Sequence, residues 1–215
     1  MALTFEQQEI WNKFKIYYDV QYVKKIEFDD QNRLLITGDV IAAMGSAGLN
    51  VRFGKVNGSF TANGMGFRSL KGSPEEVTGT FSVARNRNLE TLEGGPLKVI
   101  GDFTAYNCNL QNLIGAPTEV GGDFHVFKNP LDSLKGMPKQ ISGSITLNYE
   151  PSLGMLRTLV AQKGVSFNTG VAPVSWDKVI KCQDIINKYA GQGKIAIFDC
   201  QKDLEDAGFP ENARW

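Results

Sequence analysis

The sequence predicts an α/β repeat solenoid, in which short units stack into one continuous core between two caps. Three recurring features predict it: a Gly-x-Phe pair every 21 or 22 residues, two apolar residues three positions apart, and a Gly-x-Pro after them. A unit of this length cannot bury its own apolar face, so neighbouring units must share a core. The pairs are Gly58/Phe60, Gly79/Phe81, Gly101/Phe103 and Gly122/Phe124, with Gly143/Ile145 as a degraded fifth copy.

Residues 1–37 are expected to form an N-terminal cap made of a helix and a hairpin. Thr4 and Gln7 have the spacing of a capping box, and the apolar residues after them predict an amphipathic helix to about residue 18. Two apolar stretches then flank residues 29–32, whose composition is typical of a hairpin turn.

Residues 38–160 are expected to form the solenoid, with Gly38-x-Val40 as an imperfect first repeat. The Phe, Leu and Val columns should point inward. The spacing of the Leu pairs suits a coil or a single helical turn, and the following Gly-x-Pro should end that segment and turn the chain. Each unit is therefore expected to contain a short strand, a turn and a short return segment.

Residues 161–215 are expected to form a C-terminal helical cap or module. Ser175 is the predicted N-cap of one helix, and Gly191 its stop. A second helix is expected over about 195–207, followed by a tail docked through its terminal aromatic residue. Residues 161–174 fit either a final repeat or a linker.

The repeat resembles the leucine-rich repeat. Two copies carry the resemblance, through Val99, Phe103, Ala105, Cys108 and Leu110, and through Val120, Phe124, Val126, Asn129 and Leu131. The resemblance implies a right-handed solenoid with a parallel sheet on one face and an inward polar ladder at Cys108 and Asn129. The first spacing is one residue longer than the template. The Gly-x-Phe strand and Leu-x-Gly-x-Pro return are similar to the short divergent repeats of bacteriophage and bacterial proteins.

The overall composition bears on nucleic-acid binding, on the cellular compartment and on membrane insertion. Lys+Arg and Asp+Glu both number 23, so the chain lacks the net positive charge that is typical of duplex binders. Three cysteines without a Cys-x-x-Cys motif indicate a reducing compartment, and we expect a cytoplasmic protein. No apolar run reaches the length of a membrane span, and no secretion signal begins the chain.

Catalytic and metal-binding patterns are scarce. His125 is the single histidine, which excludes histidine clusters, and no phosphate-binding loop or nucleophile elbow occurs. We expect no enzyme, no cofactor and no metal site.

One part of the exposed sheet face differs from the rest. The residues that flank Phe should face outward, and in most units they are small and polar. In two adjacent units they should place Tyr106 beside Phe127 and Asp102 beside Asp123, with His125 between, a combination typical of a binding surface. The candidate partner-binding residues are Asp102, Thr104, Tyr106, Asp123, His125 and Phe127. Alternatively, a terminal segment folds over the sheet and buries the two aromatic rings.

The leading hypothesis is therefore a non-catalytic, protein-binding solenoid. Its repeats suggest a bacteriophage accessory (counter-defence) protein that inhibits a host defence or toxin enzyme in the host cytoplasm, with the acidic patch mimicking or occluding a nucleic-acid surface. One alternative is an enzyme, or a regulatory subunit, with its site in the C-terminal module at Trp176, Asp177, Asp199 and Asp203. Another is a nucleic-acid binder that uses Arg85, Arg87, Lys98, Lys128 and Lys135, which the zero net charge disfavours.

Overall fold

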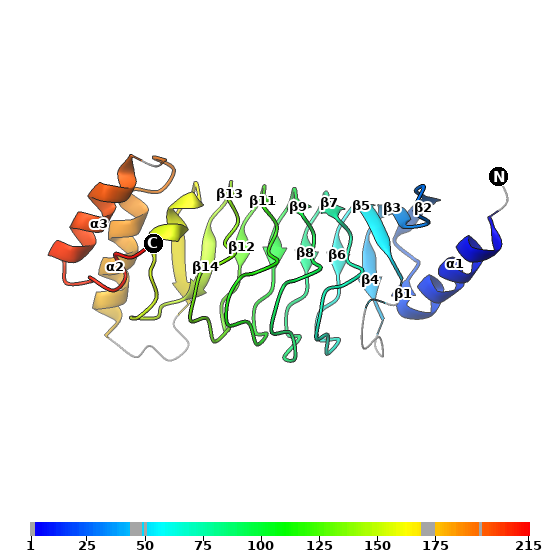
Figure 1. The fold of residues 1–215 in the computed structure, drawn as a ribbon, viewed down its shortest axis with the longest axis horizontal. Coiled ribbons are helices and arrows are strands. Elements are labelled where there is room, and N and C mark those ends of the chain that lie inside the picture. Colours follow the sequence, from blue (N-terminus) through cyan, green and yellow to red (C-terminus); the bar gives the residue numbers. More distant parts are fainter. Residues whose placement is uncertain (1–2, 44–48, 50, 169–174, 194) are drawn as a thin grey trace.

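The computed structural model describes residues 3–43, 49, 51–168, 175–193 and 195–215. It is a β-solenoid with one helix at its N-terminal end and two helices at its C-terminal end (Figure 1). The coils stack along the long axis of the molecule, so each coil contacts mainly the coil before it and the coil after it. The predicted solenoid and its helical caps are therefore confirmed.

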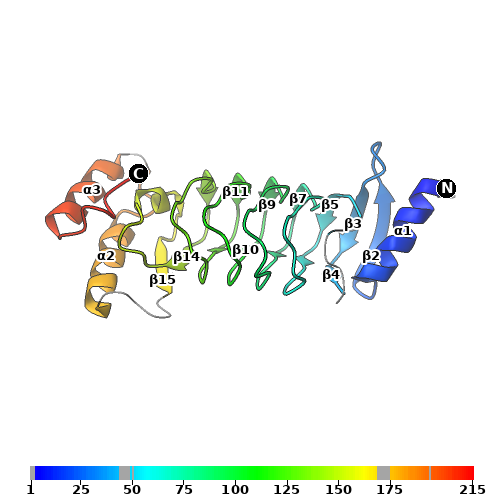
Figure 2. The ribbon, with the colours of Figure 1, turned by 60° about the horizontal axis from the view of Figure 1, so that its bottom comes forward.

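Every coil except the last contributes one short strand to each of two sheets, and Figure 2 shows the sheets running side by side along the solenoid. Sheet A contains, in spatial order, β1 (Tyr18–Asp19), β4 (Val40–Ala42), β6 (Phe60–Thr61), β8 (Phe81–Ser82), β10 (Phe103–Thr104), β12 (Phe124–His125), β14 (Ile145–Asn148) and β15 (Val165–Asn168). Sheet B contains β13 (Gln140–Ile141), β11 (Glu119–Val120), β9 (Lys98–Val99), β7 (Glu76–Val77), β5 (Phe53–Asn57), β3 (Leu34–Gly38) and β2 (Val23–Phe28). Among the strand pairs of the described residues, β1–β4 and β2–β3 are antiparallel and the others are parallel.

The second sheet corrects the expectation of a single sheet with return segments. The Val column pairs from coil to coil, with Val77 opposite Val99 and Val99 opposite Val120. The likeness to leucine-rich repeats is not confirmed, because here two strands of each coil, rather than one, lie in parallel sheets. Two-residue strands have no resolvable alternation, so the sequence pattern could not reveal the second sheet.

The core is a ladder of phenylalanine rings from the Gly-x-Phe column. Phe60, Phe81, Phe103 and Phe124 are fully buried. Their ring centroids lie 5.3, 5.6 and 5.1 Å apart in succession, with the planes within 20° of parallel. Full burial of one such ring contributes about 1.5–3 kcal/mol, and each aromatic pair about 0.5–1.5 kcal/mol more. This ladder sets the register of sheet A.

A polar ladder runs inside the corner that follows sheet A. The amide of Asn86 donates to the carbonyls of Ala62 and Val83 at 2.9 and 2.8 Å. Asn129 repeats these bonds two coils later with the carbonyls of Ala105 and Val126, both at 2.8 Å. Between them the Cys108 thiol contacts the Val83 carbonyl at 3.4 Å. The predicted ladder role of Cys108 and Asn129 is thus confirmed, and Asn86 belongs to the same column.

The helix and the hairpin predicted for the N-terminal end are present, although Phe5, in the predicted apolar pattern, is exposed. Helix α1 (Phe5–Tyr17) begins with the Thr4/Gln7 capping box. β2 and β3 form the predicted hairpin around residues 29–32. Phe14 of α1 is fully buried and lies edge-on to Phe53 at 6.0 Å, so the helix extends the aromatic core at this end.

The C-terminal cap begins with β15, which pairs with β14 and continues sheet A into the segment predicted for the module. Residues 161–168 therefore belong to a final coil, whereas 169–174 lie outside the described residues. The 3-10 helix η1 (Leu156–Val160) precedes β15, and α2 (Trp176–Lys188) and α3 (Ala196–Asp206) follow it. Ser175 is at the predicted N-cap position, but its side chain makes no cap bond.

Two further contacts close this end. The side chains of Gln183 and Asn187 in α2 bond the backbone of β15, at 2.8 Å to the Phe167 N–H and 2.7 Å to the Val165 N–H. They occupy the outer edge of the last strand, where another strand would otherwise pair. The tail is docked, but through buried Asn212, which donates to the carbonyl of Leu153 at 2.9 Å, whereas the terminal aromatic residue Trp215 is 57% exposed.

Candidate functional site

The six predicted binding residues lie together on the outer face of sheet A. β10 and β12 pair in parallel with Phe103 opposite Phe124 and Thr104 opposite His125. Because side chains alternate across a strand, the residues beside these buried phenylalanines face outward. All six are partly exposed: Asp102, Thr104, Tyr106, Asp123, His125 and Phe127.

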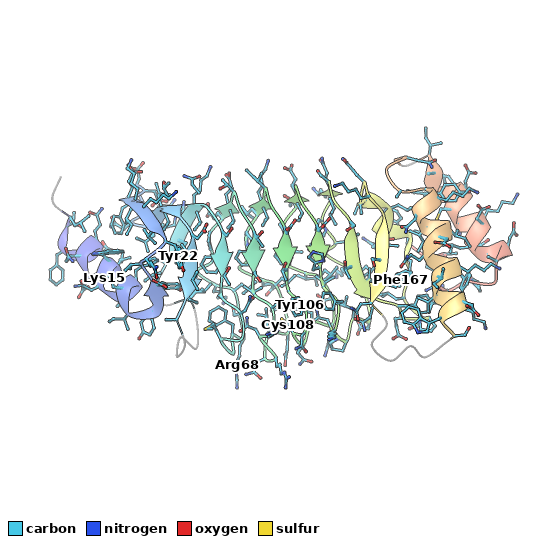
Figure 3. All side chains as sticks on the ribbon, turned by 180° about the vertical axis from the view of Figure 1, so that it is seen from behind. Lys15, Tyr22, Arg68, Tyr106, Cys108 and Phe167 are labelled. Atoms are coloured by element: carbon cyan, nitrogen blue, oxygen red, sulfur yellow. The ribbon has the colours of Figure 1, made fainter. Side chains whose placement is uncertain are left out.

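Tyr106 and Phe127 stack as predicted. Their ring centroids lie 4.7 Å apart with an interplanar angle of 8°. The Arg85 guanidinium of the preceding coil lies over the Tyr106 ring, 5.8 Å from its centroid. We call Arg85, Tyr106 and Phe127 the aromatic stack. Figure 3, which shows the molecule from behind, labels Tyr106 just beyond the ends of the sheet A strands.

Arg85 is not among the residues predicted for this site. Its position is created by the backbone, which has a left-handed conformation at one corner of successive coils. The corner residues are Gly64, Arg85, Asn107 and Lys128, with φ values of 68°, 63°, 54° and 56°. Glycine and asparagine suit this conformation, whereas a long side chain there costs on the order of 1–2 kcal/mol. In the sequence, Gly64 and Asn107 at the equivalent positions are the signal that could have indicated this left-handed corner.

The two carboxylates have a different role from the one the sequence suggested. The Asp102 Oδ1 accepts the Asp123 backbone N–H at 2.8 Å, and the Asp123 Oδ1 accepts the Ser144 N–H at 2.8 Å. The Ser144 N–H is the main reason that the pKa of Asp123 is held below its ordinary value. Charge-assisted bonds to the next coil thus compensate for adjacent like charges. A further contact of either carboxylate with a partner stays a prediction.

The glycines of the Gly-x-Phe column make room for these bonds. A Cβ on Gly122 would lie 2.1 Å from the Asp102 Oδ1, and one on Gly143 would lie 2.2 Å from the Asp123 Oδ1. Neither glycine has a positive φ, so close approach rather than a tight bend requires them. Gly72, in the Gly-x-Pro column, has a φ of 95° and does fit the predicted bend.

The single histidine, His125, contacts the neighbouring strand. Its Nδ1 lies 3.2 Å from the Thr146 Oγ1 on the neighbouring strand. Among the residues that the structure describes, no group of three or more His, Cys, Asp or Glu side chains could hold a metal ion.

The described parts of the two ends leave the aromatic stack uncovered. α1 lies at one end of the solenoid, and α2 and α3 lie at the other (Figures 1 and 2). α2 packs on β15 and η1. Burial of Tyr106 and Phe127 under a terminal segment is therefore not seen in the described part of the chain.

The alternative site in the C-terminal module is dispersed. Asp177 and Asp203 line an open cleft between α2 and α3, whereas Asp199 does not line it and Trp176 is largely exposed. The Asp203 Oδ2 accepts from the Lys188 Nζ at 2.7 Å and from the Tyr189 hydroxyl at 2.6 Å. These bonds lower the pKa of Asp203, and they tie the two helices together.

The cysteines are also structural. Cys182 and Cys200 are fully buried between the C-terminal helices, and all three cysteines are free. Burial raises the pKa of the Cys182 thiol to about 12 and those of Cys108 and Cys200 to about 11. Such thiols are unreactive at neutral pH.

The basic residues considered for nucleic acid do not form one surface. Of these residues, Lys98 lies on sheet B and pairs with Glu119 at 2.8 Å. Arg85 and Lys128 lie instead at the corner beside sheet A.

No described helix combines the length and the apolar character needed to cross a bilayer. Comparison with protein-family models, with curated proteins and with solved structures finds no match to this chain.

Proposed function

We propose that the chain is a non-catalytic binding protein that docks a protein partner on the outer face of sheet A, at the aromatic stack. One observation carries this proposal: Tyr106 stacks on Phe127, and the Arg85 guanidinium lies over the Tyr106 ring. Tyrosine and arginine are enriched among the residues that dominate binding energy at interfaces.

Rigidity favours this surface as a binding site. Phe103 and Phe124 are fully buried beneath the strands that carry the stack, and the corner backbone has the same conformation in successive coils. A surface that is already ordered loses little conformational entropy on association. The partner is expected to offer an apolar or aromatic side chain to the rings and a carboxylate to Arg85.

The partner class follows from the repeats rather than from the site. As proposed from the sequence, a bacteriophage counter-defence role would make the partner a host defence or toxin enzyme in the bacterial cytoplasm. The carboxylates of Asp102 and Asp123 are bonded along the solenoid, so we rest inhibition on coverage of the partner by the stack rather than on acidic mimicry of nucleic acid.

A second candidate function is the binding of single-stranded nucleic acid. Stacked aromatic rings with an arginine over one face are the arrangement on which unpaired bases stack. Titration with a fluorescent oligothymidylate at low salt separates the two functions. Saturable binding that weakens as salt rises supports the second candidate, because phosphate contacts release counterions.

The test of the protein-binding proposal is affinity capture from a bacterial lysate with three versions of the chain. These are the wild type, Tyr106→Ser/Phe127→Ser and the control Phe198→Ser, which changes an exposed aromatic residue of α3. A stoichiometric protein that is retained by the wild type and the control and lost by the double variant is expected. Removal of an interface aromatic costs about 2 kcal/mol or more, hence at least about 30-fold in affinity for each of the two rings. Retention by a folded double variant would place the interface elsewhere.

A further inference from the structure

A hollow lies at the C-terminal end of sheet B, between that sheet and the residues Gly191, Gly193 and Ile197. Its volume is about 550 Å³, within the range of small-molecule sites. Its apolar lining consists of Met137, Pro138, Leu159, Val160, Ile197 and Trp215. We call it the C-terminal hollow, and it is separate from the aromatic stack.

The hollow exists because sheet B ends before sheet A. The N–H groups of Thr118 and Lys139 bond the carbonyls of Leu97 and Thr118, each at 2.9 Å, and so continue the ladder from coil to coil. Val160 follows Lys139 by the same 21 residues that separate Thr118 from Lys139, but it belongs to η1 instead of a strand. The chain contacts sheet B again at the isolated Ile141–Ala161 bridge. The space of the missing strand is left between the sheet and the helical cap.

The charged side chains that line the hollow are basic. Arg157 and Lys139 line it, and none of the described residues that line it has an acidic side chain. Within the described residues, neither cation forms an ion pair. The Arg157 guanidinium lies over the Trp215 ring, 5.5 Å from its centroid. By contrast, neighbouring Arg214 is paired with Glu211 and does not line the hollow.

We propose that the C-terminal hollow binds a small amphiphilic anion, a molecule with an apolar ring or chain and one carboxylate, sulfonate or phosphate head. The guanidinium of Arg157 presents a planar set of donors that fits such a head, and stacking on Trp215 holds it at the edge of the apolar wall. Lys139 adds a second positive charge. Met137, Leu159 and Ile197 contact the apolar body. This inference does not depend on the proposed protein partner.

The test compares two fluorescent probes that differ mainly in charge. 1-Anilinonaphthalene-8-sulfonate carries the apolar body and an anionic head, and N-phenyl-1-naphthylamine carries the body alone. Each is titrated against the wild type, Arg157→Gln and the control Lys163→Gln. Lys163 is an exposed cation close in sequence to Gln162 of the hollow but outside its lining.

We expect saturable binding of the anionic probe that weakens about 10-fold in Arg157→Gln and stays within twofold in the control. Binding of the neutral probe should change less than twofold in both variants. If circular dichroism shows that Arg157→Gln is unfolded, Lys139→Gln replaces it, with a loss of at least threefold expected for the anionic probe alone. No saturable binding, an unchanged affinity in the hollow variants, or equal losses for both probes would overturn the proposal.

Discussion

Replacement of Gly122 by alanine tests whether the Gly-x-Phe column exists to admit a carboxylate from the preceding coil. The new Cβ would lie 2.1 Å from the Asp102 Oδ1, far inside van der Waals contact. The carboxylate must move away, and the Asp123 N–H then loses the 2.8 Å bond that it donates. A hydrogen bond to a charged group contributes about 1.5–3 kcal/mol, and this site is partly exposed, so we expect Gly122→Ala to cost about 1.5–2 kcal/mol through this bond.

A double-mutant cycle isolates this cause. Asp102→Ala removes the same hydrogen bond, so the bond is lost only once when both substitutions are combined. The free energy of unfolding of the double variant should therefore exceed the additive expectation by about 1.5–2 kcal/mol. A residual cost of Gly122→Ala remains in the double variant, because the new Cβ also lies 2.8 Å from the backbone carbon of Gly101.

The assay is urea denaturation of the wild type, the two single variants and the double variant, followed by circular dichroism. Thr61→Ala, on the same face of sheet A, replaces Asp102→Ala in a control cycle and should add to Gly122→Ala within about 0.5 kcal/mol. Strict additivity between Asp102 and Gly122 would refute the close-approach explanation. A changed urea dependence in the variants would show that the coils no longer unfold together.

Three further outcomes are expected. Phe103→Ala should destabilise the chain by about 3–5 kcal/mol in the same urea assay, whereas Thr104→Ala on the outer face should cost less than about 0.5 kcal/mol; equal losses would reverse the inward and outward assignment. Burial raises the pKa values of the three thiols from about 9 to about 11 or 12. Above pH 9 the unfolded chain therefore loses thiol protons that the folded chain keeps, and the free energy of unfolding should fall between about pH 9 and pH 12. Replacement of all three cysteines by alanine should flatten that fall, and an unchanged profile would assign it to other groups. Asn187→Ala should open the edge of β15 and produce concentration-dependent association in sedimentation velocity, while the surface variant Lys181→Ala should stay unchanged; identical behaviour would mean that the edge needs no cover.

The charged side chains on the outer faces of sheet A and sheet B have different partners. On sheet B, Lys98 and Glu119 pair across neighbouring coils, and Lys55 pairs with Glu76, so these charges are matched within the sheet. On sheet A, the acidic side chains bond the backbone of the next coil and leave the aromatic rings with Arg85 as the distinctive surface. This contrast favours sheet A as the side that meets a partner.

The repeat itself determined much of the fold. Because the Phe column has one register, the sequence was sufficient to place the core, to align Tyr106 with Phe127 and to assign Cys108 and Asn129 to one inner column. The same count, five residues after each Phe, also places Asn86 there, although an extra residue before Leu89 obscured it. Local rules likewise predicted the Thr4 capping box and the hairpin, since neither depends on distant residues.

Only the tertiary structure decided the remainder. The second sheet depends on backbone bonds between residues about 21 positions apart, and a two-residue strand leaves no periodic trace in the sequence. The partners of Asp102 and the place of Arg85 depend on how closely successive coils approach and on a left-handed corner that an arginine adopts against its own preference. The C-terminal hollow depends on where sheet B stops. These features arise from contacts between coils, which the residues of a single repeat do not specify.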